Sequence, residues 1–464
     1  FTGTGDANGW DNLALAKVQT AASSASVVNA ISSMARIDYR FMNRYMVTLT
    51  ARRDGSSVFG ANHKFGTFPS VALAWVASSE SFIKSITAIR MLKLRASYGS
   101  VGNQAILPFQ SLTRLGAVQY VYGDGGSTSV GLFPANLPNP NLSWETTTTA
   151  NFGVDFELFR GRIGGTVEVY NMDTKDLLLS RQLPSTTGFS SILTNVGATN
   201  NKGLELTLNT INVKTEKFEW SSNFVFSTNR NKIVHLYNSD ANGDGKEDND
   251  ISNSWFIGQP ISVAFDYKVA GVYQVGDNIP VGQKAGFFRM TDINKDGKID
   301  ANDRQVLGSL QPKYRFGFTN NLSYGSFNLM FTLSAMTGWI ANNLSLTLDD
   351  ATHGNGTYPG RENFLDAGWW TATNKSDTRS SLVYTNPYNH GYYQSRDFLR
   401  IQELALSYEF PKQIVERLRI NNLKAYVSGR NLYTFTKWQG MDPESGTSLF
   451  PMARTISAGF NVSF

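Results

Sequence analysis

Apolar and polar residues alternate one by one through many segments of this chain, and the C-terminal segment shows the pattern most clearly. One face of residues 453–464 carries Ile456, Ala458, Phe460, Val462 and Phe464. The other face carries small polar residues and one glycine. Successive side chains of a strand point to opposite faces, so a two-faced β-strand is predicted here. Neither charge nor proline protects the apolar face, which favours a membrane barrel with lipid outside and no free edge.

Six internal segments repeat this alternation. Their apolar rows lie within 45–51, 152–158, 204–208, 314–318, 327–335 and 404–410. Further strands are expected near 27–40, 67–77, 90–99, 162–171, 217–230 and 422–433. We therefore predict about fourteen strands of roughly ten residues, the length that a tilted strand needs to cross the hydrocarbon layer.

A soluble sandwich or propeller also alternates, so the chemistry of the two faces has to distinguish the architectures. Charged residues such as Arg36, Asp155 and Glu157 lie in the polar rows, where a water-filled lumen tolerates them. Tyrosine and tryptophan occur toward strand ends, as in the aromatic girdles of membrane barrels. The girdle candidates are Tyr39, Tyr45, Trp144, Trp220 and Tyr324. These features favour an all-β, transmembrane antiparallel β-barrel.

This register makes a specific prediction for two neighbouring segments. The odd-numbered residues of 327–335 and the even-numbered residues of 404–410 are expected to face lipid. Arg315, Glu403 and Glu409 are expected to face the lumen.

Connections between the predicted strands differ in length. Short turns occur at 159–162 and 324–326, whereas long Gly/Asn/Asp/Ser-rich stretches occupy 101–143, 232–305 and 338–395. Outer-membrane barrels have short periplasmic turns and long extracellular loops. Because binding residues concentrate in loops, the long connections are expected to carry the binding functions.

Composition agrees with this assignment. The 464 residues include no cysteine, which suits a chain exported through an oxidising compartment, and 41% are hydrophobic. Mean hydropathy is −0.25, and no apolar run is long enough for a transmembrane helix. The formal charge of +5 comes without a compact Lys/Arg run, which argues against nucleic-acid binding.

Ordered sequence blocks resemble the signature of SusC-like TonB-dependent outer-membrane transporters. They are RDGSSVF at 53–59, FPS at 68–70, LKLRASYG at 92–99, GN at 102–103, YNMDTKDLL at 170–178, NKGLE at 201–205, FLRI at 398–401 and GRNL at 429–432. The resemblance covers nearly the whole chain. It implies a 22-stranded barrel in the outer membrane of a Gram-negative cell, plugged by an N-terminal domain.

The same resemblance implies TonB energy coupling, a SusD-like surface lipoprotein as lid, and import of a large solute such as an oligosaccharide or a peptide. Residues 1–464 are expected to form the C-terminal part of the barrel, with the plug domain, the TonB box and the first strands lying outside this segment. Two other functions stay open, a structural outer-membrane barrel without transport and a soluble surface glycan-binding protein.

The strongest chemical motif is Asp292-Ile-Asn-Lys-Asp-Gly-Lys-Ile-Asp-Ala-Asn-Asp303, which resembles an isolated calcium loop. Calcium prefers six to eight oxygen ligands. The predicted ligands are the side chains of Asp292, Asn294, Asp296 and Asp303 and the carbonyl of Lys298. Gly297 permits the tight turn. The alternative is an Asx-rich turn without metal.

Residues 240–245 repeat the opening of that motif. Position 12 of this second loop is Ile251, which cannot bind a cation, so a solvated polar loop is the better interpretation. Aromatic pairs in the long loops, Trp369 with Trp370 and Tyr392 with Tyr393, are candidates for stacking on a sugar. Packing under a lid or anchoring in a girdle explains such pairs equally well.

No constellation in the sequence predicts catalysis. The four histidines are scattered, and neither a nucleophile elbow nor a phosphate-cradling loop is present. Carboxylate pairs occur on faces where a lumen explains them. We therefore expect a transporter rather than an enzyme.

Overall fold

One curved antiparallel sheet dominates the computed structural model, which describes residues 25–122, 127–343, 368–445 and 452–464. Thirteen strands form it, in chain order. They are β1 (Ala30–Phe41), β2 (Tyr45–Ser56), β3 (Phe65–Val76), β4 (Ile89–Asn103), β7 (Glu145–Leu158), β8 (Ile163–Lys175), β11 (Ala198–Lys214), β12 (Phe218–His235), β17 (Tyr314–Tyr324), β18 (Phe327–Thr337), β21 (Phe398–Glu409), β22 (Asn422–Thr436) and β23 (Thr455–Ser463). The predicted all-β antiparallel fold is confirmed.

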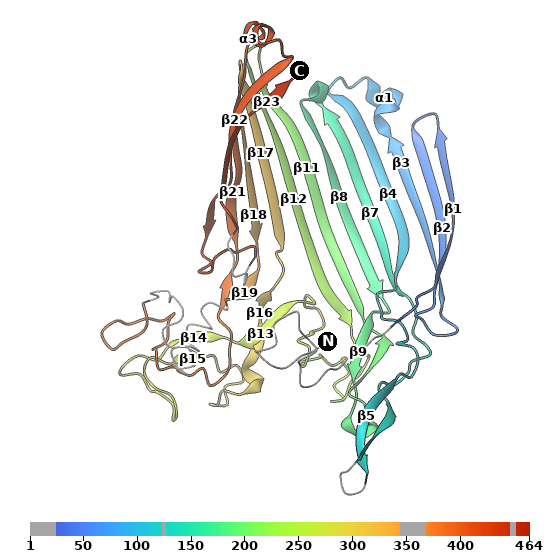
Figure 1. Cartoon of the computed structure of the whole chain (residues 1–464), viewed down its shortest axis with the longest axis vertical. Coiled ribbons are helices and arrows are strands. Elements are labelled where there is room, and N and C mark those ends of the chain that lie inside the picture. The colour runs from blue at the N-terminus through green and yellow to red at the C-terminus, as the bar shows by residue number, and fades with distance from the viewer. Residues whose placement is uncertain (1–24, 123–126, 344–367, 446–451) are drawn as a thin grey trace.

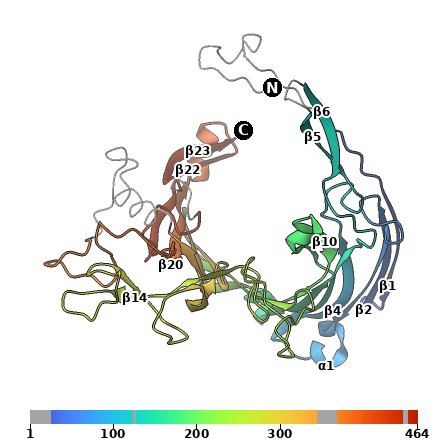
Figure 2. The ribbon, with the colours of Figure 1, turned by 90° about the horizontal axis from the view of Figure 1, so that it is seen from below.

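The sheet bends into a trough when it is viewed along the strands (Figure 2). Each strand pairs with its neighbour in chain order, and β1 and β23 form the two edges. Thirteen long strands are one fewer than predicted. All six additional segments expected from alternation are strands of this sheet.

The strand register fixes which residues share a face, and it agrees with the prediction. Phe327 pairs with Tyr408, and Leu329 pairs with Leu406. Directly paired residues project to the same side of a sheet, so the apolar rows of β18 and β21 form one continuous outer surface. Arg315 and Glu403 lie on the opposite, inner face.

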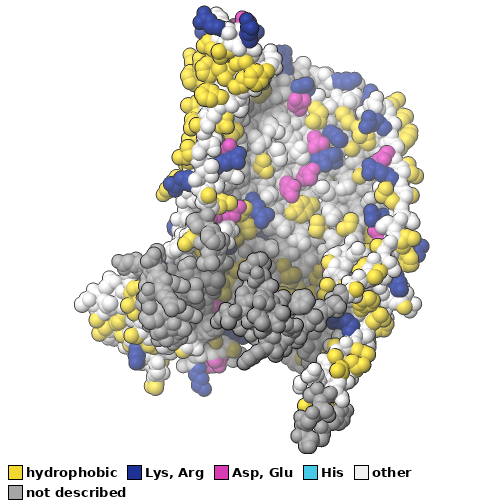
Figure 3. Space-filling view, in the orientation of Figure 1, with side chains coloured by type: hydrophobic (Ala, Val, Ile, Leu, Met, Phe, Trp, Pro, Cys, Tyr) yellow, Lys and Arg dark blue, Asp and Glu magenta, His cyan; other side chains and the backbone are white. Residues whose placement is uncertain are grey.

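Large apolar side chains on the outer face stay uncovered. Phe327 is 52% exposed, Phe460 is 68% exposed, and Phe464 at the C-terminus is 91% exposed. Such a surface is costly in water and stable against lipid. The inner face is polar and charged, and Figure 3 looks into this hollow, where Lys/Arg and Asp/Glu side chains lie among neutral polar ones.

Connection lengths differ between the two ends of the sheet, as predicted (Figure 1). At one end, the short-turn end, the connections are brief and include the small helices α1 (Ser81–Lys84) and α3 (Lys412–Arg417) and the 3-10 turns η2 (Ala77–Ser79) and η3 (Phe159–Gly161). At the other end, the long-loop end, the connections carry the additional strands β5 (Leu115–Tyr122), β6 (Ser127–Pro134), β9 (Leu178–Gln182), β10 (Ser191–Asn195), β13 (Val263–Tyr267), β14 (Val269–Val272), β15 (Phe288–Met290), β16 (Arg304–Ser309), β19 (Ile340–Asn342) and β20 (Tyr393–Ser395). No helix in the described part of the chain is long and apolar enough to span a membrane.

Buried apolar residues gather in these long-loop connections. A first cluster contains Val58, Phe59, Phe68, Leu142 and Trp144. A second contains Val272, Phe287, Phe288, Met290 and Tyr384. The expectation that Trp144 anchors an aromatic girdle is therefore wrong, because its ring packs on Phe59 and Phe68 and its Nε1–H donates to the carbonyl of Lys64.

Candidate functional site: the inner wall and the long-loop end

An arginine on the inner wall links three strands. Arg95 of β4 donates to both carboxylate oxygens of Asp155 on β7, each at 2.8 Å, and also pairs with Glu168 on β8. Its guanidinium lies over Gly153, where an added Cβ would approach Nη2 to 3.0 Å. A bidentate pair of this kind is directional as well as charged. The charges predicted for a lumen are therefore organised across neighbouring strands.

Two of the sequence blocks that resemble the family signature meet on the same wall. Tyr170 of β8 is paired with Gly203 of β11, and its ring lies over that glycine. A Cβ at Gly203 would lie 2.2 Å from the ring, so only glycine fits. The Tyr170 hydroxyl reaches Asn229 on β12. Residues of the blocks 170–178 and 201–205 thus pack against each other on the inner face of the wall.

Glycines also shape the first buried cluster. Phe68 of β3 lies over Gly66 and Gly102, where an added Cβ would come within 2.4 Å and 2.1 Å of its ring. Phe59 and Trp144 cover the same region. The blocks at 53–59, 68–70 and 102–103 therefore converge on one structural cluster at the long-loop end.

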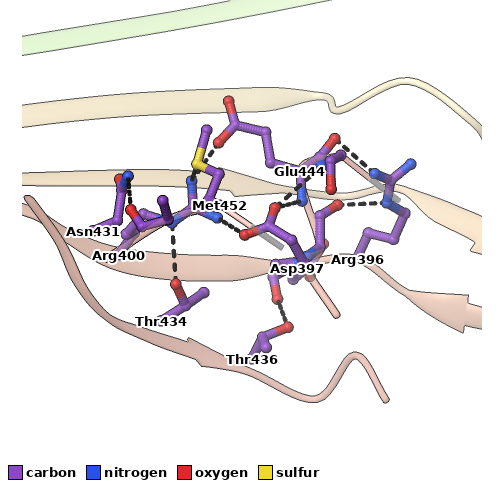
Figure 4. Close-up of polar contacts among 12 residues, drawn as sticks. Arg396, Asp397, Arg400, Asn431, Thr434, Thr436, Glu444 and Met452 are labelled. Carbon is purple, nitrogen blue, oxygen red and sulfur yellow. Dashed lines mark hydrogen bonds and ion pairs between the residues drawn. The ribbon is translucent and has the colours of Figure 1, made fainter. Parts of the chain in front are cut away.

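A buried arginine holds the last loop against the inner wall (Figure 4). Arg400 of β21 is 2% exposed. It donates to Asp442 and to Glu444, both at 2.6 Å, and to Thr434 of β22 at 3.0 Å. Asp442 and Glu444 belong to the connection between β22 and β23. We refer to Arg400, Asp442 and Glu444 as the arginine latch.

Arg396 strengthens this attachment from the neighbouring segment. Its guanidinium carbon lies 4.0 Å from the centroid of the Trp339 ring and 5.5 Å from that of Trp438. It also donates to the carbonyls of Pro443 and Glu444. Residues 438–444 are thus fixed by two arginines, although sequence patterns alone did not identify them. The available signal was an arginine inside the block 398–401 and two acidic residues in the last long loop.

The second buried cluster joins two long connections, 236–313 and 338–397, into one packed unit that we call the loop module. The rings of Phe287 and Phe288 pack edge-on against Tyr384. His390 is 1% exposed, and its Nε2 lies 3.1 Å from the Tyr384 hydroxyl. Burial lowers the pKa of His390. The stretch 344–367 of the second connection lies outside the described residues.

The predicted sugar-stacking aromatics have different environments. Trp370 packs on the second cluster and donates to Gln274 at 2.8 Å, and Tyr392 packs against Phe288. Burial raises the pKa of Tyr393 to about 12, with Asp266 as its charged neighbour. Trp369 is half-buried and lies near the guanidinium of Arg379. Packing therefore accounts for Trp370 and Tyr392, and stacking on a sugar stays a prediction for the group.

The predicted calcium loop lies in the connection between β12 and β17, between β15 and β16. Asp292 accepts from the backbone N–H groups of Lys295 and Gly297, and Asn294 accepts from that of Asp296. Gly297 has a φ of +82°, the left-handed conformation expected at this position. The side-chain oxygens of positions 1 and 3 thus already turn toward the interior of the loop.

Position 12 closes the predicted calcium loop. The carboxylate of Asp303 is fully buried and accepts from the N–H groups of Ile293 and Asp300. The N–H of Asp300 is the main reason why the pKa of Asp303 lies below its usual range. Among the described residues, no three His, Cys, Asp or Glu side chains converge closely enough to hold a metal alone. Calcium would therefore depend also on Asn294 and on the Lys298 carbonyl.

The loop at 240–248 repeats this hydrogen-bonding pattern. Asp240 accepts from Gly245, Asn242 from Asp244, and Asp244 from Lys246. Asp248 accepts from the N–H of residue 241, the role that Asp303 has in the other loop. The two loops therefore share a backbone design, although the position-12 residue of this one is apolar.

Comparison with known proteins identifies the family. The family model described as TonB dependent receptor-like, beta-barrel matches residues 2–432. The chain belongs to the TonB-dependent receptor β-barrel family.

Individual relatives of this TonB-dependent receptor chain agree with the assignment. TonB-dependent receptor P3 of Formosa agariphila is 33% identical over 94% of this chain and 45% of its own length. TonB-dependent receptor SusC of Bacteroides thetaiotaomicron is 28% identical over 99% of this chain and 46% of its own length. This chain thus spans about half the length of the relatives that it matches.

A solved structure with the same fold is that of the RagAB peptide importer in its open-open state. It is 25% identical, with a TM-score of 0.79, and covers 97% of this chain and 49% of the solved chain. Its closed-closed state matches with a TM-score of 0.78. The SusC-like resemblance, the β-barrel wall and the outer-membrane location predicted from the sequence are confirmed. A soluble glycan-binding protein is thereby excluded.

Proposed function

We propose that the protein containing this chain imports a large solute across the outer membrane, driven by TonB and covered by a SusD-like surface lipoprotein. The observation that supports this proposal most strongly is the match of almost the whole chain to RagAB, which is named as a peptide importer, and to SusC. The family consists of receptors and transporters, so catalysis is not part of the proposal.

The inner wall suits a solute rich in hydroxyl or amide groups. A concavity of about 830 Å³ on the wall is lined by neutral polar residues, glycines and a few apolar side chains, and by the ion pair of Lys93 with Asp155. Its neutral polar lining includes Thr166, Asn209, Ser221, Asn223 and Asn321. Such groups exchange hydrogen bonds with a passing oligosaccharide or peptide without holding one charge strongly. The solute class proposed is therefore oligosaccharide or peptide.

The long connections are the proposed contact surface for the solute and the lipoprotein lid. They lie at one end of the sheet, which is the extracellular end in outer-membrane barrels. The half-buried side chains of Trp369 and Tyr393 are the aromatic candidates for stacking on a solute. Trp370 and Tyr392 would support that surface from beneath.

Calcium is the proposed structural ligand of the loop at 292–303, held by Asp292, Asn294, Asp296, Asp303 and the Lys298 carbonyl. A bound calcium ion would offset the repulsion among the clustered carboxylates and keep the loop in one shape. Extracellular calcium modules bind in the range of about 10⁻⁴–10⁻³ M. The observation behind this proposal is that the loop already turns its side-chain oxygens inward.

Uptake of labelled peptide and oligosaccharide mixtures tests the proposed import function. Cells that express the full-length protein should accumulate a subset of the mixture, and deletion of TonB should abolish that accumulation. Deletion of 338–395 should abolish solute or lid binding while the barrel still assembles. Unchanged uptake without TonB, or no uptake of either mixture, would favour the structural barrel that lacks transport.

A further inference from the structure

A polar pocket of about 590 Å³ lies at the long-loop end, between the hairpin of β9 and β10 and the base of the hairpin of β5 and β6. Ser180 of β9 and Leu193 of β10 are directly paired and line it from one hairpin. Residues within 105–114 and 133–137 line it from the connection that carries the other hairpin. Figure 2 shows β10 inside the curve of the sheet. The pocket therefore lies at the mouth of the trough.

The apolar part of the pocket lining rests on the first buried cluster. Ile106, Leu178 and Leu193 line the pocket and also pack against that cluster. Next to them, the side chain of Asn195 accepts from the N–H of Ser143 and donates to its carbonyl, both at 2.8 Å. The pocket thus has a packed support, which holds its polar groups in place before any ligand arrives.

Arg114 is the one charged residue that lines this pocket. The side-chain oxygen of Asn136 accepts from the backbone N–H of Arg114 at 2.8 Å and from its Nε–H at 3.3 Å. The amide nitrogen of Asn136 in turn donates to the carbonyls of Leu112 and Leu137. The guanidinium is therefore fixed through Nε. Its two Nη groups make no hydrogen bond or ion pair with any residue that the structure describes.

The chemistry of the lining favours an anion over a cation. No carboxylate lines the pocket, and that of Glu145 accepts instead from the N–H of Leu178 and from the amide of Asn103. Arg95 and Arg400 elsewhere in the molecule both pair with carboxylates. The planar fork of an arginine matches the two oxygens of a carboxylate, and hydroxyl and amide groups suit the neutral parts of a solute. The neutral polar lining comprises Gln110, Asn136, Ser180, Ser190 and Ser191.

We propose that this pocket binds a carboxylate group of the imported solute, with Arg114 as its partner and Asn136 as the positioning residue. The proposal rests on the proposed import function and narrows the solute to a carboxylate-bearing oligomer. A uronic acid of an oligosaccharide and an acidic group of a peptide supply the same chemistry. Sites for small ligands span about 300–1,000 Å³, so the pocket takes one part of an oligomer rather than a whole chain.

Equilibrium binding to the purified full-length protein in about 0.15 M salt, which screens distant charges, tests this proposal. The probes are an oligogalacturonate and its methyl ester, and an acidic peptide and its fully amidated form. At least one carboxylate probe should bind more tightly than its neutral counterpart, and the probe that does so identifies the source of the carboxylate. R114Q should bind that probe about 10- to 100-fold more weakly and its neutral counterpart normally, since the lost hydrogen bonds are to a charged group.

Three variants separate the geometry of the pocket from charge alone. R181Q removes the same charge from β9, but Arg181 alternates with Ser180 and projects from the opposite face, so binding should stay normal. R114K keeps the charge without the planar fork and should restore only part of the affinity. N136A releases the guanidinium and should weaken the carboxylate probe by a smaller factor than R114Q, with the neutral probe unaffected.

A second variant tests the pocket without changing any charge. S180W fills it and should weaken binding of the carboxylate probe. Arg114 and Ser180 are exposed, so both variants should keep the heat-resistant folded form of the barrel on gels. Equal binding of charged and neutral probes by the wild type, unchanged binding by R114Q or S180W, or an equal loss in R181Q would overturn the proposal.

Two further measurements separate this pocket from the other roles of the long loops. Weaker binding of the surface lipoprotein by R114Q, with unchanged probe binding, would overturn the proposal, because Arg114 would then pair with a carboxylate of the lid. Uptake of the same probes by cells tests import separately. Probe binding that depends on Arg114 without TonB-dependent uptake would keep the pocket and reject the import function. TonB-dependent uptake that R114Q leaves unchanged would reject the pocket alone.

Discussion

The wall and the loop module of this chain are built on different principles. Along the wall, side chains on both faces contact solvent or lipid, and large apolar residues such as Phe460 remain 68% exposed. In the loop module, Phe288 and Tyr384 are almost completely buried, and His390 is enclosed with them. The distribution of side chains in the wall follows from lipid on one face and water on the other. The loop module instead has an aromatic core like that of a small soluble domain. The effect of a substitution in the wall should therefore depend on which face of the sheet the side chain occupies. In the loops it should depend on the individual contacts that the side chain makes.

The largest effect is expected at the arginine latch, which joins the wall to the connection between β22 and β23. Arg400→Ala leaves the buried carboxylate of Asp442 without its partner, which should lower the free energy of unfolding by about 3–5 kcal/mol. Urea unfolding of the purified protein in detergent measures this change.

The matched control for the latch is Arg430→Gln on β22. Arg430 pairs with Glu403 at 3.5 Å and is largely exposed, so its loss should cost at most about 1 kcal/mol. Similar losses in the two variants would show that residues 438–444 are not held by the latch.

A smaller effect is expected from adding charge to the wall, and its size should depend on the face. Leu406→Arg places a cation on the lipid side and should destabilise the barrel by about 2–4 kcal/mol if it lies near the bilayer midplane. Ala405→Arg, one residue earlier on β21, points into the lumen and should cost much less. Folding of both variants into lipid vesicles measures the difference, and equal costs would contradict the register.

The strands of the wall could be predicted well from the sequence. Alternation of apolar and polar residues follows locally from having lipid on one face and water on the other. The faces of β18, β21 and β23 follow directly from residues two apart. The calcium-like backbone at 292–303 was also predictable, since an Asp/Asn/Gly pattern determines its own turns. Prediction failed for Trp144, because an aromatic residue near a strand end has the same local pattern whether it anchors in a membrane or packs in a cluster.

The latch and the loop module were not predictable for a related reason. Arg400 and Asp442 are 42 residues apart, and only the pairing of β21 with β22 brings their segments together. Likewise, Trp370 meets Gln274 across 96 residues. Single-sequence patterns carry no information on such contacts, so the arginine in the block 398–401 and the acidic residues of the last long loop could not be assigned to each other.

Calcium should stabilise the loop module and leave the wall unchanged. With a dissociation constant of about 10⁻⁴–10⁻³ M, 10 mM calcium should add roughly 1.4–2.7 kcal/mol to the stability of the loop. Protease resistance of the module with calcium and with EGTA measures this effect. Asp296→Ala should abolish the increase in protease resistance with calcium. An increase that persists in this variant would show that calcium does not bind at the loop 292–303.

Acid should loosen the loop module by a smaller amount. The pKa of His390 is lowered by burial, so the unfolded module binds its proton first as pH falls below about 6.5. The free energy of unfolding of the module then falls by at most about 1.4 kcal/mol per pH unit, because the imidazole of His390 is neutral in the folded module. Proteolysis between residues 263 and 310 should be faster at pH 5.5 than at pH 7.5. His390→Phe should remove this difference, and a variant that keeps the full pH response would contradict the role of His390.

Cysteine labelling along β21 tests the central claim, that one face of this wall contacts lipid and the other lines an aqueous lumen. Residues 1–464 contain no cysteine, so single cysteine substitutions at Glu403, Leu404, Ala405 and Leu406 each place one thiol in this segment. In outer-membrane vesicles, a water-soluble maleimide should label positions 403 and 405 rapidly and positions 404 and 406 hardly at all. Equal labelling at all four positions, or the reverse alternation, would contradict the account.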